Sequence, residues 1–130
     1  MKRTLLIATT NKGKLSEISA FFDSMPFIQC IGFDGLNSEY PAPEEIEETI
    51  EGNALLKARY WAKKSGHLVV ADDGGLFISA LDGWPGVRSA RAGENDDARV
   101  EAVLERLQGV DDRSAAFRCA LAMHDPLTGN

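Results

Sequence analysis

The stretch from Val69 to Leu76, which reads Val-Val-Ala-Asp-Asp-Gly-Gly-Leu, constrains the fold more than any other part of the chain. β-Branched residues followed by two carboxylates predict a buried strand with negative charge at its carboxyl end. Charge at that position is typical of the ligand-binding edge of an α/β sheet. The two glycines predict a tight turn, with bare backbone that a ligand approaches closely, before a second strand over residues 76–81. A turn selected only for its backbone geometry is the alternative interpretation.

Strand-like segments alternate with amphipathic helical segments along the chain, which predicts an α/β fold in a single domain spanning residues 1–130. The clearest strand runs from Ala115 to Met123, where larger side chains alternate strictly with smaller or polar ones. The remaining elements follow from apolar spacing and cap residues: strands at 4–8, at 27–31 and immediately before Asp72, and helices at 12–22, at 49–64 and from about 95.

Composition excludes several classes of function. Hydrophobic residues make up 44% and charged residues 26% of the chain, as in globular proteins, and no apolar run is long enough to span a bilayer. A net charge of −6 argues against general binding to nucleic acid. Cys30 and Cys119 lack metal-ligand partners at useful spacing and indicate free thiols in a reducing cytoplasm. We therefore expect a cytoplasmic protein with no nucleic-acid or membrane partner. A small anionic ligand is compatible with this composition.

The segment between the first strand and the first helix has the chemistry of an anion site. Unpaired N–H groups at a helix start suit a phosphate, and a lysine in the first turn reaches the same anion. The segment differs from a Walker loop, because Ala8 and Leu15 stand where that motif requires Gly and Ser or Thr. A plain helix cap with solvated lysines is the alternative. The candidate residues are Thr9, Thr10, Asn11 and Lys14.

A second polar group surrounds the start of the second helix. Asn53 and Lys57 are four residues apart and share one helix face, where Lys57 is suited to bind a phosphate or simply lies in water. Glu44 and Glu45 precede the helix. Carboxylates at that position interact favourably with the helix dipole, which explains them without any function.

The paired aspartates form the third polar group. Adjacent side chains of a strand point to opposite faces, so only one of Asp72 and Asp73 is expected to face a pocket squarely. Carboxylates such as those of Glu45 and Asp73 are hard oxygen ligands suited to Mg²⁺.

In their order and spacing, these motifs resemble the inosine triphosphate pyrophosphatase family. The matching segments cover nearly the whole chain: residues 8–14, 48–58, 71–76 and 80–91. The resemblance implies an elongated mixed β-sheet flanked by helices, and usually a homodimer. It also implies Mg²⁺-dependent hydrolysis of nucleoside triphosphates with unusual purines, such as ITP, dITP and XTP, to the nucleoside monophosphate and pyrophosphate.

The resemblance also implies roles for individual residues. Glu45 and Asp73 would hold the metal, with Glu44 not separable from Glu45, and Asp73 would be the base that activates water. From strand alternation, and not from the resemblance, we expect the other aspartate, Asp72, to cap a turn or to support the site from behind. The substrate-binding set that we predict is Thr9, Thr10, Asn11, Lys14, Asn53, Lys57 and Gly74.

The chain departs from the family pattern in two places. Gly74 stands where the family has Ser, so one side-chain contact is lost although a backbone N–H remains. The chain also stops at Asn130, before the aromatic-Gly-Tyr-Asp-Pro segment and the late Ser-His-Arg that read the purine base in the family. We therefore expect the C-terminal part of the family fold to be missing and one edge of the 115–123 strand to lack its neighbour. A non-catalytic nucleotide-binding remnant and a pyrophosphatase of another nucleotide are the alternative functions.

Overall fold

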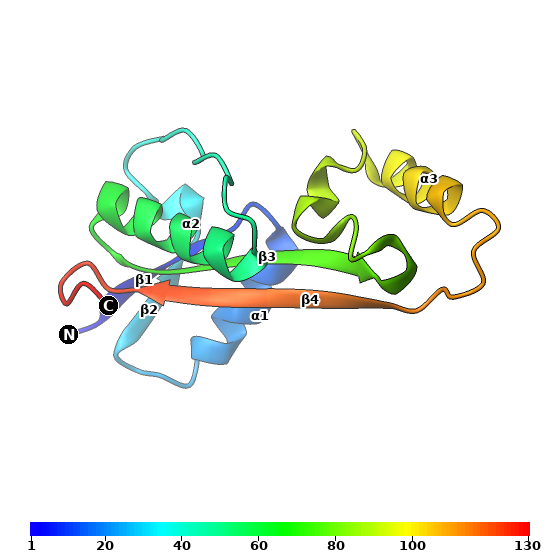
Figure 1. The fold of residues 1–130 in the computed structure, drawn as a ribbon. Coiled ribbons are helices and arrows are strands. Elements are labelled where there is room, and N and C mark those ends of the chain that lie inside the picture. The colour runs from blue at the N-terminus through cyan, green and yellow to red at the C-terminus, as the bar shows by residue number, and fades with distance from the viewer.

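The structure, a computed structural model, describes residues 1–130 and contains one four-stranded sheet in the order β2-β1-β3-β4 (Figure 1). The strands are β1 (Arg3–Ala8), β2 (Ile28–Ile31), β3 (Leu68–Ile78) and β4 (Ala115–His124). The α-helices are α1 (Lys12–Phe22), α2 (Ile50–Ser65) and α3 (Asp96–Arg106), and the 3₁₀ helices are η1 (Phe33–Gly35), η2 (Ser79–Leu81) and η3 (Gly86–Arg91). The predicted α/β class with a mixed sheet flanked by helices is confirmed.

The order of the strands creates a switch point at one end of the sheet. β1, β2 and β3 run parallel, and β4 runs antiparallel to β3. The chain passes from β1 through α1 to β2 on one side of β1, and then returns through α2 to β3 on the other side. Ligand crevices in open α/β sheets lie where the connections diverge in this way, beyond the carboxyl ends of the strands. Here that end lies at Ala8 and Ala71, the last pair that joins β1 to β3.

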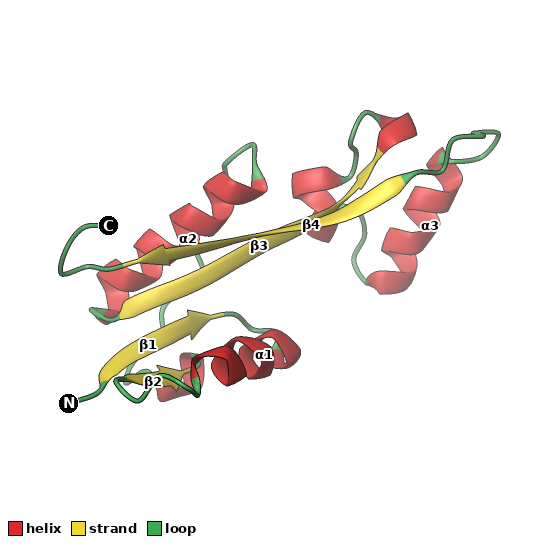
Figure 2. Ribbon diagram, turned by 90° about the horizontal axis from the view of Figure 1, so that it is seen from below, coloured by secondary structure: helices red, strands yellow, loops and turns green.

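Beyond Ala71, β3 leaves β1 and pairs with β4, and the two strands continue as an arm that extends past β1 and β2 to η3 and α3 (Figure 2). One isolated bridge also joins Phe77 of β3 to Pro85. The prediction of a glycine turn and a separate strand at 76–81 is wrong. β3 runs unbroken through Asp72 and both glycines to Ile78, and residues 79–81 form η2.

The glycines have a packing role instead of a turning role. A Cβ on Gly74 would lie 3.2 Å from the backbone oxygen of Arg118, and a Cβ on Gly75 would lie 2.1 Å from the backbone oxygen of Gly86. A side chain at Gly75 would therefore displace the neighbouring backbone, whereas one at Gly74 would require only a small shift of β4. The close approach of a ligand to this backbone stays a prediction, because the atoms next to these glycines belong to the protein itself.

Helices cover both faces of the sheet, and each face has its own apolar cluster. On the α1 face, the helix side chains Leu15, Ile18 and Phe22 pack against Leu5, Ile7 and Val70. On the α2 face, Ala58, Trp61 and Ala62 pack against Leu6, Ala8, Val69 and Ala71. Full burial of an aliphatic side chain of this size contributes about 1.5–3 kcal/mol, so the two clusters hold β1 and β3 in fixed register beneath the switch point.

β4 forms the outer edge of the sheet. It was predicted as a strand, and that is confirmed, but its larger apolar side chains are exposed: Phe117 by 84%, Leu121 by 64% and Met123 by 46%. No helix of the protein combines the length and the apolar character needed to cross a membrane.

Candidate functional site

A cavity of about 1030 Å³ opens at the switch point, and its walls come from several separate parts of the chain. The loop after β1 and the start of α1 form one wall. The acidic segment, residues 37–48, forms another wall with α2, and β3, β4 and η3 form the remainder. Phe33, Leu36, Tyr40 and Trp61 add an apolar surface. Of the predicted site residues, the cavity brings together Thr9, Thr10, Asn11, Lys14, Glu45, Lys57, Asp73 and Gly74.

The loop after β1 is held by short-range hydrogen bonds. Thr9 Oγ1 accepts a hydrogen bond from the Asn11 N–H at 3.1 Å, and Asn11 Oδ1 accepts one from the Lys14 N–H at 3.1 Å. Asn11 is therefore the cap of α1, as its residue type predicts. The capped end leaves N–H groups of the first turn without intrahelical partners at the cavity wall, and the partial positive charge of the helix end favours an anion there.

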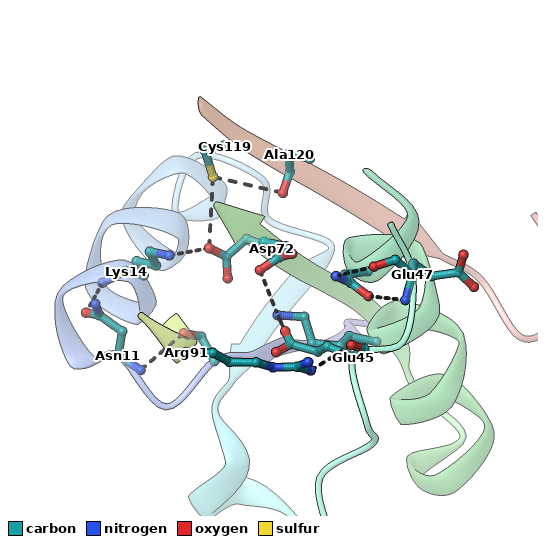
Figure 3. Close-up of polar contacts among 12 residues, drawn as sticks. Asn11, Lys14, Glu45, Glu47, Asp72, Arg91, Cys119 and Ala120 are labelled. Atoms are coloured by element: carbon teal, nitrogen blue, oxygen red, sulfur yellow. Dashed lines mark hydrogen bonds and ion pairs between the residues drawn. The ribbon is translucent and has the colours of Figure 1, made fainter. Parts of the chain in front are cut away.

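Lys14 and Asp72 both line the cavity and form an ion pair (Figure 3). Asp72 is only 5% exposed, and its Oδ2 also lies 3.9 Å from the Sγ of Cys119. The hydrogen bond to Asp72 raises the pKa of Lys14. Lys14 is thus charged, and its direction is set by Asp72.

A second charged group lies on the opposite face of β3, as the alternation of a strand requires. Lys57 Nζ lies 3.0 Å from Glu45 Oε1 and 4.0 Å from Asp73 Oδ1. The other oxygen of Asp73, Oδ2, is buried and has no hydrogen-bond partner. Burial raises the pKa of Asp73, Lys57 opposes that rise, and Glu45 adds to it. Asp73 is therefore more basic than an ordinary aspartate.

The carboxylates of the cavity meet the needs of a metal ion only in part. No group of three or more His, Cys, Asp or Glu side chains is arranged to hold one. Two carboxylates do converge on Lys57, and one of their oxygens is an orphaned buried acceptor. Mg²⁺ is commonly bound by one or two carboxylates together with substrate phosphates and water, so this pair fits such an ion and not a closed protein cage. Of the two candidate glutamates, only Glu45 lines the large cavity and approaches Lys57, while Glu44 lines a neighbouring hollow.

Asn53, expected in the substrate-binding set, does not line the large cavity. Its side chain is buried, with 2% exposed. Its Oδ1 accepts a hydrogen bond from the Glu47 N–H at 3.0 Å, and its Nδ2 donates to the Glu47 carbonyl at 3.4 Å. The residue holds the acidic segment in place, which accounts for a poor helix former in the middle of a helix.

Two contacts at the site have no local signal in the sequence. Arg91 donates a hydrogen bond at 2.8 Å to the carbonyl oxygen of Glu45, 46 positions away (Figure 3). Ser89 Oγ accepts a hydrogen bond from the Leu76 N–H at 2.8 Å and donates one to the Gly86 carbonyl at 2.6 Å. Both contacts come from η3, which sequence spacing alone does not place next to the acidic residues.

The fold and the site define a class: α/β proteins with a lysine- and carboxylate-lined cavity at the switch point of a mixed sheet. Within that class the chain belongs to the Ham1 family, whose sequence profile matches residues 5–130. The family resemblance predicted from the motifs is confirmed.

Relatives and solved structures agree with this assignment. A protein of Oceanobacillus iheyensis named dITP/XTP pyrophosphatase is 46% identical over 129 residues, which cover 95% of this chain and 65% of the relative. A Caulobacter vibrioides protein of the same name is 47% identical over 131 residues, covering 97% and 66%. The structure of a HAM1 protein from Coxiella burnetii has a TM-score of 0.86 and 36% identity, covering 98% of this chain and 66% of that one. The Ham1 protein of Staphylococcus aureus has a TM-score of 0.83 and 38% identity, covering 95% and 64%. The chain thus spans slightly less than two thirds of the length of these relatives.

Proposed function

We propose that this protein hydrolyses purine nucleoside triphosphates with unusual bases, such as ITP, dITP and XTP, to the nucleoside monophosphate and pyrophosphate. The observation that carries the proposal is the meeting of Lys14, Lys57, Glu45 and Asp73 around one cavity at the switch point. Relatives that match nearly the whole chain are named dITP/XTP pyrophosphatases, which supports the choice of reaction. We further propose that the protein acts in the cytoplasm as a homodimer, as the resemblance implies.

The charges of the cavity favour a triphosphate that arrives with a divalent cation. Two lysines face three carboxylates, so the group carries one net negative charge before any ligand binds. A cation about 4 Å from a phosphate oxygen contributes on the order of 4 kcal/mol near a protein surface, but here each lysine already has a carboxylate partner. A polyphosphate therefore requires additional positive charge in the cavity. Thr9, Thr10 and Asn11, with the first turn of α1, would supply neutral hydrogen bonds to the phosphates, and the Gly74 N–H would supply another.

In this proposal Glu45 and Asp73 would hold Mg²⁺, and the ion would supply positive charge to offset that of the phosphates. The Asp73 carboxylate would accept the proton of the attacking water. Lys57 keeps the two carboxylates close together in the free protein, and Lys14, oriented by Asp72, reaches the outer phosphates.

The test is the identity of the products. The protein is incubated with ITP, XTP, dITP and ATP in the presence of Mg²⁺, and pyrophosphate is assayed separately from orthophosphate. Pyrophosphate in equal amount to the monophosphate is expected. Orthophosphate with a nucleoside diphosphate would contradict the proposal. Tight binding of the triphosphate without turnover would instead support the non-catalytic nucleotide-binding alternative.

A further inference from the structure

The acidic segment, residues 37–48, carries Glu45 but has no regular structure of its own. None of its residues takes part in a backbone–backbone hydrogen bond. Side chains hold it at three points: Tyr60 Oη donates to the Pro41 carbonyl, Asn53 bonds both backbone groups of Glu47, and Arg91 donates to the Glu45 carbonyl at 2.8 Å. Arg91 provides the only hydrogen bond to the main chain of Glu45.

The other end of this contact is fixed to β3 just beyond Asp73. η3 is held there by Ser89, which bonds the Leu76 N–H, and by Gly75, whose missing side chain admits the Gly86 carbonyl. Any movement of η3 away from β3 would break the hydrogen bond that the Leu76 N–H donates to Ser89 Oγ. Arg91 therefore links the strand that carries Asp73 to the irregular segment that carries Glu45.

We propose that Arg91 is a positioning residue that sets the separation of the Glu45 and Asp73 carboxylates. Glu45 has a long side chain that is 36% exposed, so Lys57 alone restrains only its tip. A hydrogen bond to the Glu45 carbonyl restrains the backbone from which that side chain extends. Because Glu45 is then already ordered in the free protein, the entropic cost of ordering it does not weaken ligand binding. The metal-binding part of this inference rests on the proposed function, and the restraint itself does not.

Arg91→Ala removes the hydrogen bond to the Glu45 carbonyl, and Arg88→Ala is the matched control. Both arginines belong to η3 and are exposed, so neither variant is expected to disturb the core. Arg88 makes no hydrogen bond or ion pair through its side chain, and its loss removes the same charge from the same short helix. Arg91→Lys keeps the charge but not the planar, multi-donor geometry, so we expect it to restore the contact only partly.

The first readout is cleavage by a glutamate-specific endopeptidase in the stretch from Glu44 to Glu48, which needs neither metal nor nucleotide. We expect Arg91→Ala to be cleaved there several-fold faster than the wild type and Arg88→Ala to match the wild type, because proteolysis follows local opening. Thermal melts verify that all variants remain folded. Equal cleavage of Arg91→Ala and wild type would overturn the inference.

The second readout is the Mg²⁺ concentration that gives half-maximal pyrophosphate release from ITP. Outer residues that orient metal ligands typically change metal affinity about 10–100-fold, so Arg91→Ala should raise this concentration about tenfold while the rate at saturating Mg²⁺ stays nearly constant. A lower saturating rate with an unchanged Mg²⁺ requirement would overturn the inference, because Arg91 would then act on the substrate. A wild type that releases no pyrophosphate refutes the proposed function, and the proteolysis result then decides the inference by itself.

Discussion

Replacing Asp73 by Asn should produce a protein that is less active and more stable than the wild type. The change keeps the shape of the side chain and removes a proton acceptor and one negative charge. A positioned general base contributes about 10²–10⁴-fold to turnover, and we expect at least that loss of pyrophosphate release. The loss is larger if Asp73 also binds the metal.

The gain in stability follows from the surroundings of the carboxylate. Asp73 Oδ2 is buried without a partner, and Glu45 shares Lys57 with Asp73. An unsatisfied buried polar group costs about 1–3 kcal/mol, more when charged, so relief of the charge should raise the free energy of unfolding by about 1 kcal/mol. For a chain of this size, that corresponds to a rise in Tm of about 4 °C.

The pH dependence of this gain has a defined sign. The pKa of Asp73 is raised in the folded state, so the folded protein holds the proton more tightly than the unfolded chain does. Protonation of Asp73 therefore adds stability at low pH, and this contribution is lost as the pH rises through the folded-state pKa. The advantage of Asp73→Asn should be complete at neutral pH and shrink as the pH falls toward the aspartate range.

Asp72→Asn is the matched control, since it makes the same chemical change one residue away. Asp72 has a partner in Lys14, so its loss should lower the Tm and cost less turnover than Asp73→Asn. The assays are calorimetric melts at several pH values and pyrophosphate release at saturating Mg²⁺. Nearly full turnover in Asp73→Asn, an equal or larger loss in Asp72→Asn, or a lower Tm for Asp73→Asn at neutral pH would refute the assignment of the two carboxylates.

Three further outcomes test the fold. Arg3 bonds Asp125 and lowers the pKa of that carboxyl to about 2, so Asp125→Asn should be less stable than wild type above the ordinary aspartate range, and acid unfolding curves should converge as the pH falls through about 2. Gly75→Ala would place a Cβ 2.1 Å from the Gly86 oxygen and should cost about 3 kcal/mol in urea unfolding; an unchanged free energy would contradict the packing role. The exposed edge of β4 should make the 130-residue chain self-associate in sedimentation, and Leu121→Lys should weaken this; a wild type that stays monomeric would contradict it.

Short-range patterns in the sequence determined much of the secondary structure. The bounds of α1 and its Asn11 cap follow from contacts within three residues, and the buried stripe of α2 follows from helical spacing. Such features can be predicted without a structure because the interacting groups are neighbours along the chain. The opposite orientations of Asp72 and Asp73 belong to the same class, since alternation is a property of any strand.

Tertiary structure alone decided how the glycines pack, which of Glu44 and Glu45 lies beside Lys57, and the partners of Asn53. Gly74 and Gly75 read as a turn because glycine tolerates turn geometry, but a continuous β3 was selected by its long pairing with β4. Glu45 was distinguished from Glu44 only by which of them reaches Lys57. The contact from Arg91 joins groups 46 positions apart, and no local propensity encodes such a distance. These features depend on where the folded backbone passes, and that is fixed by the packing of the whole sheet and its helices.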